Sequence, residues 1–322
     1  MNKEDYKRAF GKIEPDAHYE QRLARNLSEY GRSKASGLKR RAMVSAAVGL
    51  AVVACAGIIT FSGLDGGSNP IATQPPGQTV ADGSVFIPKL ELPEKTNAMM
   101  QMIGLIVYQG RIYTQTSTRI PPEAAEAVLG EKIGRTKANI DEWSSQSEYA
   151  EELASTVGEL DVYTVQGYDS DFRIMTYQIF DGRIVTEYYE CLNGIRISSG
   201  VDLLGKLNIV GNVQSASWET YDSWNNSQNQ RHELAVDATL DNFLKALSTA
   251  KPIAAEKLFK QGIYDQGGQS RKFVLLKLKD QSEVRLELHE DGYVRYVPAD
   301  VFFKLEDAAF DAMWTRLNAF RK

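Results

Sequence analysis

One stretch of the chain carries no charged residue. It covers residues 42–64, 23 positions dominated by Ala, Val and other apolar side chains. As a helix this stretch would be about 35 Å long, and a bilayer core about 30 Å thick needs about 20 apolar residues to cross it. The pattern therefore predicts one transmembrane helix over residues 42–64.

Three other interpretations of this stretch stay open. A secretory signal has a shorter apolar region close to the N-terminus, whereas 41 residues precede this one. Val52-Val53-Ala54-Cys55 resembles a lipobox, in which the Cys carries a lipid, but the residues after Cys55 remain apolar. A buried helix of a soluble domain would show a polar face. The membrane span is the favoured interpretation.

The charges on either side predict the orientation. Arg32, Lys34 and the run Lys39–Arg41 precede the stretch, and Asp65 follows it. Because basic flanks stay in the cytoplasm, residues 1–41 are expected inside the cell membrane and residues 65–322 outside. The first segment holds 11 basic and 6 acidic residues and the second holds 26 and 36. An acidic exterior argues against nucleic acid as a partner.

Residues 1–41 are predicted to be a short helical stub. Apolar side chains recur at helical spacing, and they are Tyr6, Phe10, Tyr19, Leu23, Leu27 and Tyr30. A segment of this length cannot bury a core by itself. The stripe is expected either to lie on the membrane surface with little structure of its own, or to dock into a groove of a cytoplasmic partner.

Residues 65–83 are rich in Gly, Pro, Ser and Thr and predict a linker. Two α+β domains are then expected, residues 84–232 and 233–322. In the first, short apolar runs predict strands around Val85–Pro88 and Leu105–Thr116. Helices are expected over 121–130 and 140–156, and the Asp181-Gly182 pair predicts a hairpin turn between strands 172–180 and 183–192.

The C-terminal domain has the clearest periodicity. A helix is predicted over 234–247, strands over 273–279, 284–289 and 293–297, and a final amphipathic helix around 309–317. Alternation in the middle strand places His289 on the solvent face. The predicted fold class is α+β, antiparallel sheets with helices packed on their apolar faces.

Few residues suggest chemistry. The three histidines, His18, His232 and His289, lie far apart and none has a second His or a Cys at metal-ligand spacing. Asp169 and Asp171 lack the further ligands and the Gly of a calcium loop, which favours a turn capped by the two Asp side chains. Cys191 is expected to pack as a small core residue. No catalytic residue, metal or cofactor is predicted.

Three aromatic residues close to one another form a candidate ligand-stacking group, Trp218, Tyr221 and Trp224. Aromatic rings beside Asn and Asp can stack on sugars or on a partner's surface. They can also form the core at a domain boundary, which is the favoured interpretation.

The chain resembles a family of single-pass membrane proteins from Firmicutes, some of which are similar to anti-sigma factors. The resemblance rests on the layout of stub, basic flank, span and exterior, on the opening MNKEDYKRAFGKIEP, and on the phrase VYTVQGYDSDFR at 162–173. It implies a stub that holds a cytoplasmic sigma factor or another regulator, and an exterior that senses or binds a ligand at the envelope. The stub has no Cys and therefore lacks the zinc-binding pattern of some anti-sigma modules.

Three functions follow from these patterns. The favoured hypothesis is a membrane-anchored regulator that couples an exterior domain to a cytoplasmic partner. The alternative is an envelope binding or scaffold module without such a partner. An exterior enzyme is the least favoured, because the motifs of the common enzyme classes are missing from the sequence.

Overall fold

The computed structural model describes residues 76–90, 103–141, 144, 147, 150–265, 267–305 and 308–319. All of them belong to one unit of the chain, residues 53–322. The predicted helical stub, with Tyr6, Phe10, Tyr19, Leu23, Leu27 and Tyr30, lies outside the described residues. The stretch 42–64 lies outside them as well.

The expected α+β class is wrong, because sheet dominates the fold. Strands account for 38% and helices for 22% of the described residues, and in this part of the chain every paired strand is antiparallel to its neighbour. The predicted transmembrane architecture is also corrected: among the described residues, no helix has the length and apolar character to cross a membrane.

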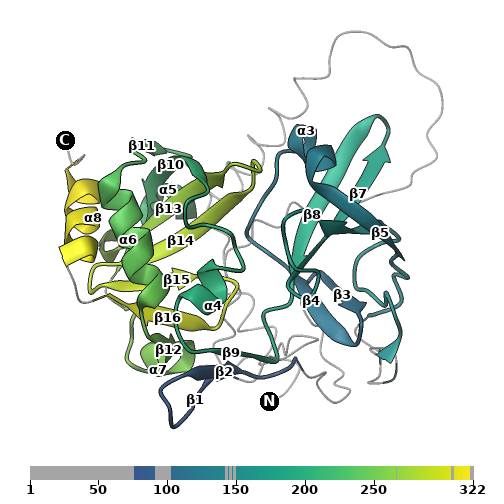
Figure 1. Ribbon diagram of the computed structural model, residues 1–322, viewed down its shortest axis with the longest axis horizontal. Coiled ribbons are helices and arrows are strands. Elements are labelled where there is room, and N and C mark those ends of the chain that lie inside the picture. The colour runs from purple at the N-terminus through teal and green to yellow at the C-terminus, as the bar shows by residue number, and fades with distance from the viewer. Residues whose placement is uncertain are drawn as a thin grey trace, which may run out of the picture. The chain divides into compact units, whose positions relative to one another are not determined.

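The first half of the described chain forms a six-stranded sheet (Figure 1). Its strand order is β3-β4-β8-β7-β6-β5. The strands are β3 (Leu105–Tyr108), β4 (Arg111–Gln115), β5 (Leu129–Arg135), β6 (Asp161–Val165), β7 (Arg173–Phe180) and β8 (Arg183–Glu190). The predicted turn at Asp181-Gly182 is confirmed, since both residues have positive φ, 48° and 74°, as a tight two-residue hairpin turn requires.

The predicted helix over 121–130 is shorter than expected. Only α3 (Pro122–Ala125) is helical, followed by one 3-10 turn, η1 (Glu126–Val128). Leu129 then enters β5 and pairs with Val165 of β6. Pro122 at the first position favours the helical turn, but the pairing with β6 ends it.

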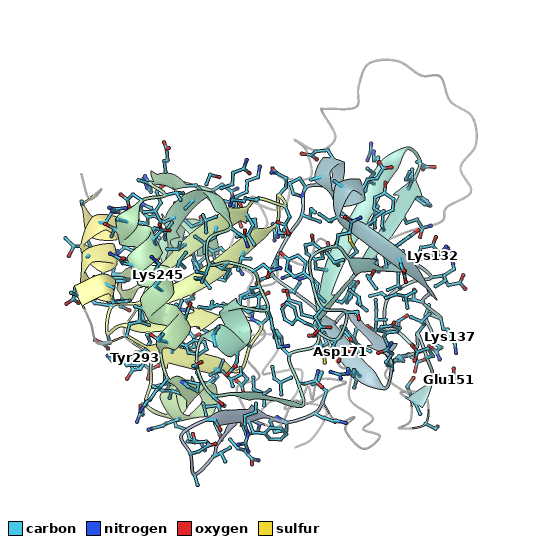
Figure 2. The ribbon with its side chains drawn as sticks, viewed as in Figure 1. Lys132, Lys137, Glu151, Asp171, Lys245 and Tyr293 are labelled. Atoms are coloured by element: carbon cyan, nitrogen blue, oxygen red, sulfur yellow. The ribbon has the colours of Figure 1, made fainter. Side chains whose placement is uncertain are left out.

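The predicted helix over 140–156 is wrong, because none of the described positions is α-helical: they lie in turns, bends, irregular stretches and one bridge at Ser155, with a 3-10 turn at Ala150. Its C-terminal part runs along β3 instead. The amide of Val107 donates to the Ala154 carbonyl and the amide of Leu153 donates to the Val107 carbonyl, both at 2.8 Å. The Lys137–Glu151 ion pair, 3.1 Å, lies across the same segment (Figure 2). Long-range backbone pairing outweighs local helix propensity here.

The second half forms a seven-stranded sheet of order β11-β10-β13-β14-β15-β16-β12. The strands are β10 (Val213–Thr220), β11 (His232–Leu234), β12 (Pro252–Ala254), β13 (Arg271–Leu278), β14 (Glu283–His289), β15 (Tyr293–Tyr296) and β16 (Val301–Lys304). The predicted boundary between residues 232 and 233 falls inside this sheet, because β10 precedes it and pairs with β13.

Two helices cover one face of this sheet, α6 (Ala238–Thr249) and α8 (Ala308–Asn318) (Figure 1). Leu240, Phe243 and Leu247 of α6 pack with Phe310 and Met313 of α8 against the even-numbered strand positions of β13 and β14. Burying side chains of this size contributes about 1.5–3 kcal/mol each to folding. The predicted packing of helices on the apolar face is therefore present.

Alternation alone predicted that the opposite face of the sheet would be open to solvent, but this face is covered. Helices α5 (Tyr221–Asn225) and α7 (Ala255–Lys260) follow strands β10 and β12. His289 is completely buried, with its ring edge-on to Tyr264 and Phe302. The prediction for His289 is therefore wrong, because the segment after α7 covers it.

A third, three-stranded sheet contains β1 (Gln78–Thr79), β2 (Val85–Ile87) and β9 (Ile195–Ile197). Strand β1 lies inside the predicted linker 65–83 and pairs with β2. Strand β9 leads into α4 (Val201–Leu204). Val85, Ile87 and Ile197 reach the core shared with the seven-stranded sheet.

A buried polar network connects the six-stranded and seven-stranded sheets. The Arg173 guanidinium and the Glu190 carboxylate, both fully buried, pair across β7 and β8 at 2.5 Å. The other Glu190 oxygen accepts a hydrogen bond of 2.7 Å from the hydroxyl of Tyr296 in β15. Thr116 and Thr118 share that hydroxyl at 2.5 and 2.8 Å. Nε and Nη2 of Arg173, both Glu190 oxygens and the Tyr296 hydroxyl are thus paired away from water, as burial requires, whereas Nη1 of Arg173 has no hydrogen-bond partner among the described residues.

Candidate functional site

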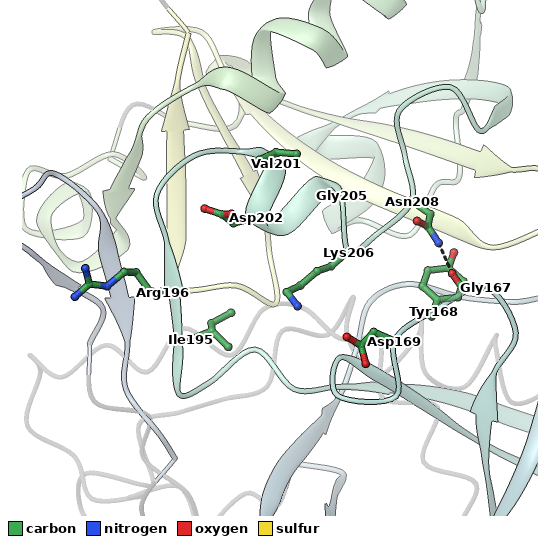
Figure 3. A pocket seen from close by; sticks show the side chains of 10 residues that line it. All are labelled: Gly167, Tyr168, Asp169, Ile195, Arg196, Val201, Asp202, Gly205, Lys206 and Asn208. Atoms are coloured by element: carbon green, nitrogen blue, oxygen red, sulfur yellow. Dashed lines mark hydrogen bonds between the residues drawn. The ribbon is translucent and has the colours of Figure 1, made fainter.

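A pocket of about 420 Å³ opens near α4 (Figure 3). Three segments form it: the turn after β6, strand β9, and α4 with the turn that follows. Its lining residues are Gly167, Tyr168, Asp169, Ile195, Arg196, Val201, Asp202, Gly205, Lys206 and Asn208. A volume in this range suits a small ligand or a short stretch of a polymer.

The first wall is a tight turn. Gly167 has a φ of 82°, which favours glycine. The Asp169 carboxylate accepts a hydrogen bond from the amide of Asp171 at 2.9 Å, and Asp171 pairs with Arg111 at 2.7 Å. The predicted capping of the turn is therefore confirmed for Asp169, whereas the Asp171 side chain binds Arg111 instead. No metal-ligand cluster occurs among the described residues.

Tyr168 anchors the same wall. Its hydroxyl donates to the Asp280 carboxylate at 2.7 Å, and its ring lies 4.2 Å from the Arg173 guanidinium. Burial raises the pKa of Tyr168 well above its usual value. The hydroxyl therefore stays protonated and keeps donating its hydrogen bond.

The second wall is fixed by α4. Asp202 accepts hydrogen bonds from the amides of Ser198 and Ser199, at 2.6 and 3.1 Å. Gly200 passes so close to α6 that a Cβ would lie 1.9 Å from the Leu247 carbonyl oxygen. Asn208 joins the two walls, since its side-chain amide donates a hydrogen bond to the backbone carbonyl of Gly167 at 2.7 Å.

Lys206 makes a weaker contact, since its Nζ lies 5.8 Å from the centroid of the Phe172 ring. Figure 3 shows its side chain extending into the space between Ile195 and Asp169. Lys206 is exposed, and in the described parts of the chain no carboxylate lies within ion-pair distance of it. By contrast, Arg196 is held by Asp82 at 3.1 Å. Lys206 is thus a cation available to a ligand.

Apolar and acidic groups complete the pocket. Ile195 is half-buried and Val201 is 56% exposed. The Asp169 carboxylate has one oxygen occupied by the Asp171 amide, and its other oxygen has no hydrogen-bond partner in the described structure. A positive and a negative group therefore flank an apolar patch.

The three predicted aromatic residues do not form one stacking surface. Trp218 is only 3% exposed and belongs to the core under α6 and α8. Tyr221 and Trp224 lie in α5 and pack on Phe273 of β13, with ring centroids 6.5 and 4.7 Å away. Thr220 caps α5 by accepting a hydrogen bond from the Ser223 amide, and the chain changes there from strand to helix.

A second, smaller pocket of about 210 Å³ lies beside Trp218. The Trp218 ring stacks on His232 at 4.7 Å. Lys272 lines the same pocket and donates to the Asn318 side chain at 2.7 Å. Tyr221 and Trp224 are not among its lining residues, so the structure separates the predicted group.

The buried groups around His289 form a closed cluster. His289 Nε2 lies 3.4 Å from a Glu287 oxygen. The other Glu287 oxygen accepts from the Tyr264 hydroxyl at 3.2 Å, and Arg295 donates to that hydroxyl at 3.0 Å. Burial raises the pKa of Tyr264 to about 12, so the hydroxyl is a weak nucleophile at neutral pH. The cluster stabilises the fold rather than presenting reactive groups.

Sequence reasoning missed both the Lys206 pocket and the Arg173–Glu190 pair. The pair had a usable signal: a two-residue turn at 181–182 sets a register in which Arg173 faces Glu190. The pocket had none, since its walls come from segments that only the tertiary fold brings together.

Comparisons with known proteins identify no relative. No family model, no curated protein and no solved structure matches the chain. The resemblance to membrane proteins similar to anti-sigma factors therefore gains no support and stays a prediction.

Proposed function

We propose that this chain is a binding module that recognises a peptide-like ligand at the Lys206 pocket. The observation that carries the proposal is the Lys206 ammonium, which has no carboxylate partner among the described residues, in an open pocket of about 420 Å³. The ligand's carboxylate pairs with Lys206, an ammonium or amide group pairs with Asp169, and an apolar side chain covers Ile195 and Val201.

Rigid walls support a binding role. The Asp202, Asn208 and Tyr168 side chains are all committed to hydrogen bonds inside the protein. A ligand would therefore meet a preorganised surface and would immobilise little besides Lys206, which lowers the entropic cost of binding. The predicted cytoplasmic partner of residues 1–41 concerns residues outside the described part and plays no role in this proposal.

Calorimetric titration of the full chain with short peptides tests the proposal. Peptides with free termini are compared with the same peptides acetylated and amidated, and we expect the free carboxylate to strengthen binding. Lys206→Gln should weaken it roughly tenfold or more, because a hydrogen bond to a charged group contributes about 1.5–3 kcal/mol. Lys206→Arg should retain most of the affinity.

Lys245→Gln is the matched control, since Lys245 is exposed on α6 (Figure 2) and does not line the pocket. The proposal fails if none of the peptides binds, or if Lys206→Gln binds as tightly as the unmodified chain.

A further inference from the structure

The far half of the β7–β8 hairpin exposes an unusual share of apolar surface. Seven large apolar side chains are well exposed among the described residues, and three of them lie here: Ile179, Phe180 and Val185, at 62, 57 and 43%. Exposed apolar groups gathered on one element mark interaction surfaces. Figure 1 shows this half of the hairpin beside α3.

Among the described residues, the outer edge of β8 has no strand partner at Ile184 and Thr186, while α3 packs beside the strand. Strand β4 pairs with β8 only at Tyr189 and Glu190, and beyond them the Thr116 amide donates to the Tyr188 carbonyl at 3.2 Å. Because peptide groups alternate in direction along an antiparallel strand, those of Thr186 and Ile184 point away from β7 as Tyr188 does. No described strand pairs with them on that side.

We propose that β8 pairs with β8 of a second copy of this chain, antiparallel about a two-fold axis at Val185, to form a homodimer. In this register Ile184 lies opposite Thr186 of the second copy. Both residues direct their amide and carbonyl groups outward, so the two equivalent pairs would form about four backbone hydrogen bonds.

The side chains in this register complement one another. Arg183, Val185 and Glu187 lie on one face of β8, since side chains alternate along a strand. Pairing about Val185 sets Arg183 opposite Glu187 of the second copy, and the symmetry repeats this pair. Val185 meets Val185 of the second copy on the axis. Opposite charges directly across two strands stabilise their pairing.

The charges of the single chain fit this arrangement. Arg183 is exposed and forms no ion pair within the described chain. Glu187 is half-buried, and burial raises its pKa in spite of the Gln115 side chain that donates to it and the nearby Arg119. An additional cation beside Glu187 would stabilise its charged form. In the proposed dimer, Arg183 in β8 of the second copy is that cation.

Sedimentation velocity of the full chain over a range of concentrations tests the dimer. The unmodified chain should dimerise as its concentration rises. Arg183→Glu replaces the cation opposite Glu187 with a second carboxylate in both symmetry-related pairs. It should therefore weaken dimerisation roughly tenfold or more. The double variant Arg183→Glu with Glu187→Arg restores opposite charges and should recover it. Lys245→Glu, the same charge change on α6, should have no effect.

Amide hydrogen exchange reports on the pairing itself. The amides of Ile184 and Thr186 should exchange more slowly at high protein concentration, because only the dimer bonds them. Circular dichroism of each variant checks that it is folded. The inference is overturned if the chain stays monomeric, if the dimer survives Arg183→Glu, or if the double variant fails to recover it.

Discussion

Cys191 illustrates how the position of a single residue determines its chemistry. It is 4% exposed, follows β8 directly, and packs with Ile106, Tyr113 and Tyr189. The core placement predicted for it is confirmed. Burial also raises the pKa of its thiol, and the reactive form of cysteine is the thiolate.

We therefore expect Cys191 to resist thiol reagents in the folded protein. A full chain carrying Cys55→Ser retains Cys191 as its one thiol. Ellman's reagent should label it slowly in native buffer and completely in guanidinium chloride. Rapid labelling in native buffer would contradict the buried position.

At the scale of elements, one carboxylate both starts a helix and ties it to another. Asp237 caps α6 by accepting hydrogen bonds from the amides of Thr239 and Leu240, at 3.0 and 3.4 Å. Arg316 of α8 binds both oxygens of the same carboxylate, at 2.8 and 2.9 Å. Hydrogen bonding from Arg316, with the two backbone amides, holds the pKa of Asp237 below its usual value.

This pairing predicts a pH-dependent stability. Because the pKa is lower in the folded state, the charged form of Asp237 stabilises the fold above the unfolded pKa of about 4, and the effect disappears as pH falls through the folded pKa. Asp237→Asn keeps a capping side chain and loses the charge. Its melting temperature should be a few degrees lower at neutral pH, with the difference shrinking in acid.

Asp241→Asn is the control for this experiment. Asp241 is exposed in the first turn of the same helix and forms no ion pair within the described residues. It should show a smaller effect. A constant difference for Asp237→Asn at all pH values would contradict the assigned role of its charge.

At the scale of the whole molecule, the network of Arg173, Glu190 and Tyr296 decides how firmly the two large sheets are connected. Backbone pairing adds to it, since Arg119 and Glu283 exchange amide-to-carbonyl bonds of 3.0 and 2.7 Å. Arg173 is enclosed by the rings of Tyr168, Phe172 and Tyr188. Without Glu190 its charge would lie buried and unbalanced.

Glu190→Gln should therefore destabilise the protein by about 3–5 kcal/mol, the cost of breaking a buried ion pair from one side. Replacing both partners, with Arg173→Met and Glu190→Leu, should cost less than the single change, because no buried charge is left. Chemical denaturation followed by tryptophan fluorescence measures both. A single variant as stable as the unmodified chain would show that water reaches Arg173.

The strands of the C-terminal sheet were the most predictable part of the fold. The predicted strands 273–279 and 284–289 correspond to β13 and β14 within two residues. Alternating side chains carry this signal locally. The helix predicted over 140–156 failed, because backbone bonds from residues 153–156 to β3 cannot be seen in a local pattern.

The candidate site was less predictable than the fold. Trp218, Tyr221 and Trp224 are neighbours in sequence, yet Trp218 faces the core under α6 and α8 while the other two pack on Phe273. Lys206 carried no signal, since a lone lysine in a loop is ordinary. Lys206 is available to a ligand because the Asp202 carboxylate accepts hydrogen bonds from the backbone amides of Ser198 and Ser199, and because Asp169 lies across the pocket.

The sequence by itself determined the strand periodicity, the hairpin turn at Asp181-Gly182 and the amphipathic faces of α6 and α8, because these depend on residues close together in the chain. Tertiary structure alone decided that sheet would dominate, that His289 would be buried, and that Lys206 would line a pocket with no carboxylate partner among the described residues. These features depend on contacts between segments that are far apart in the chain, and local patterns do not encode those contacts.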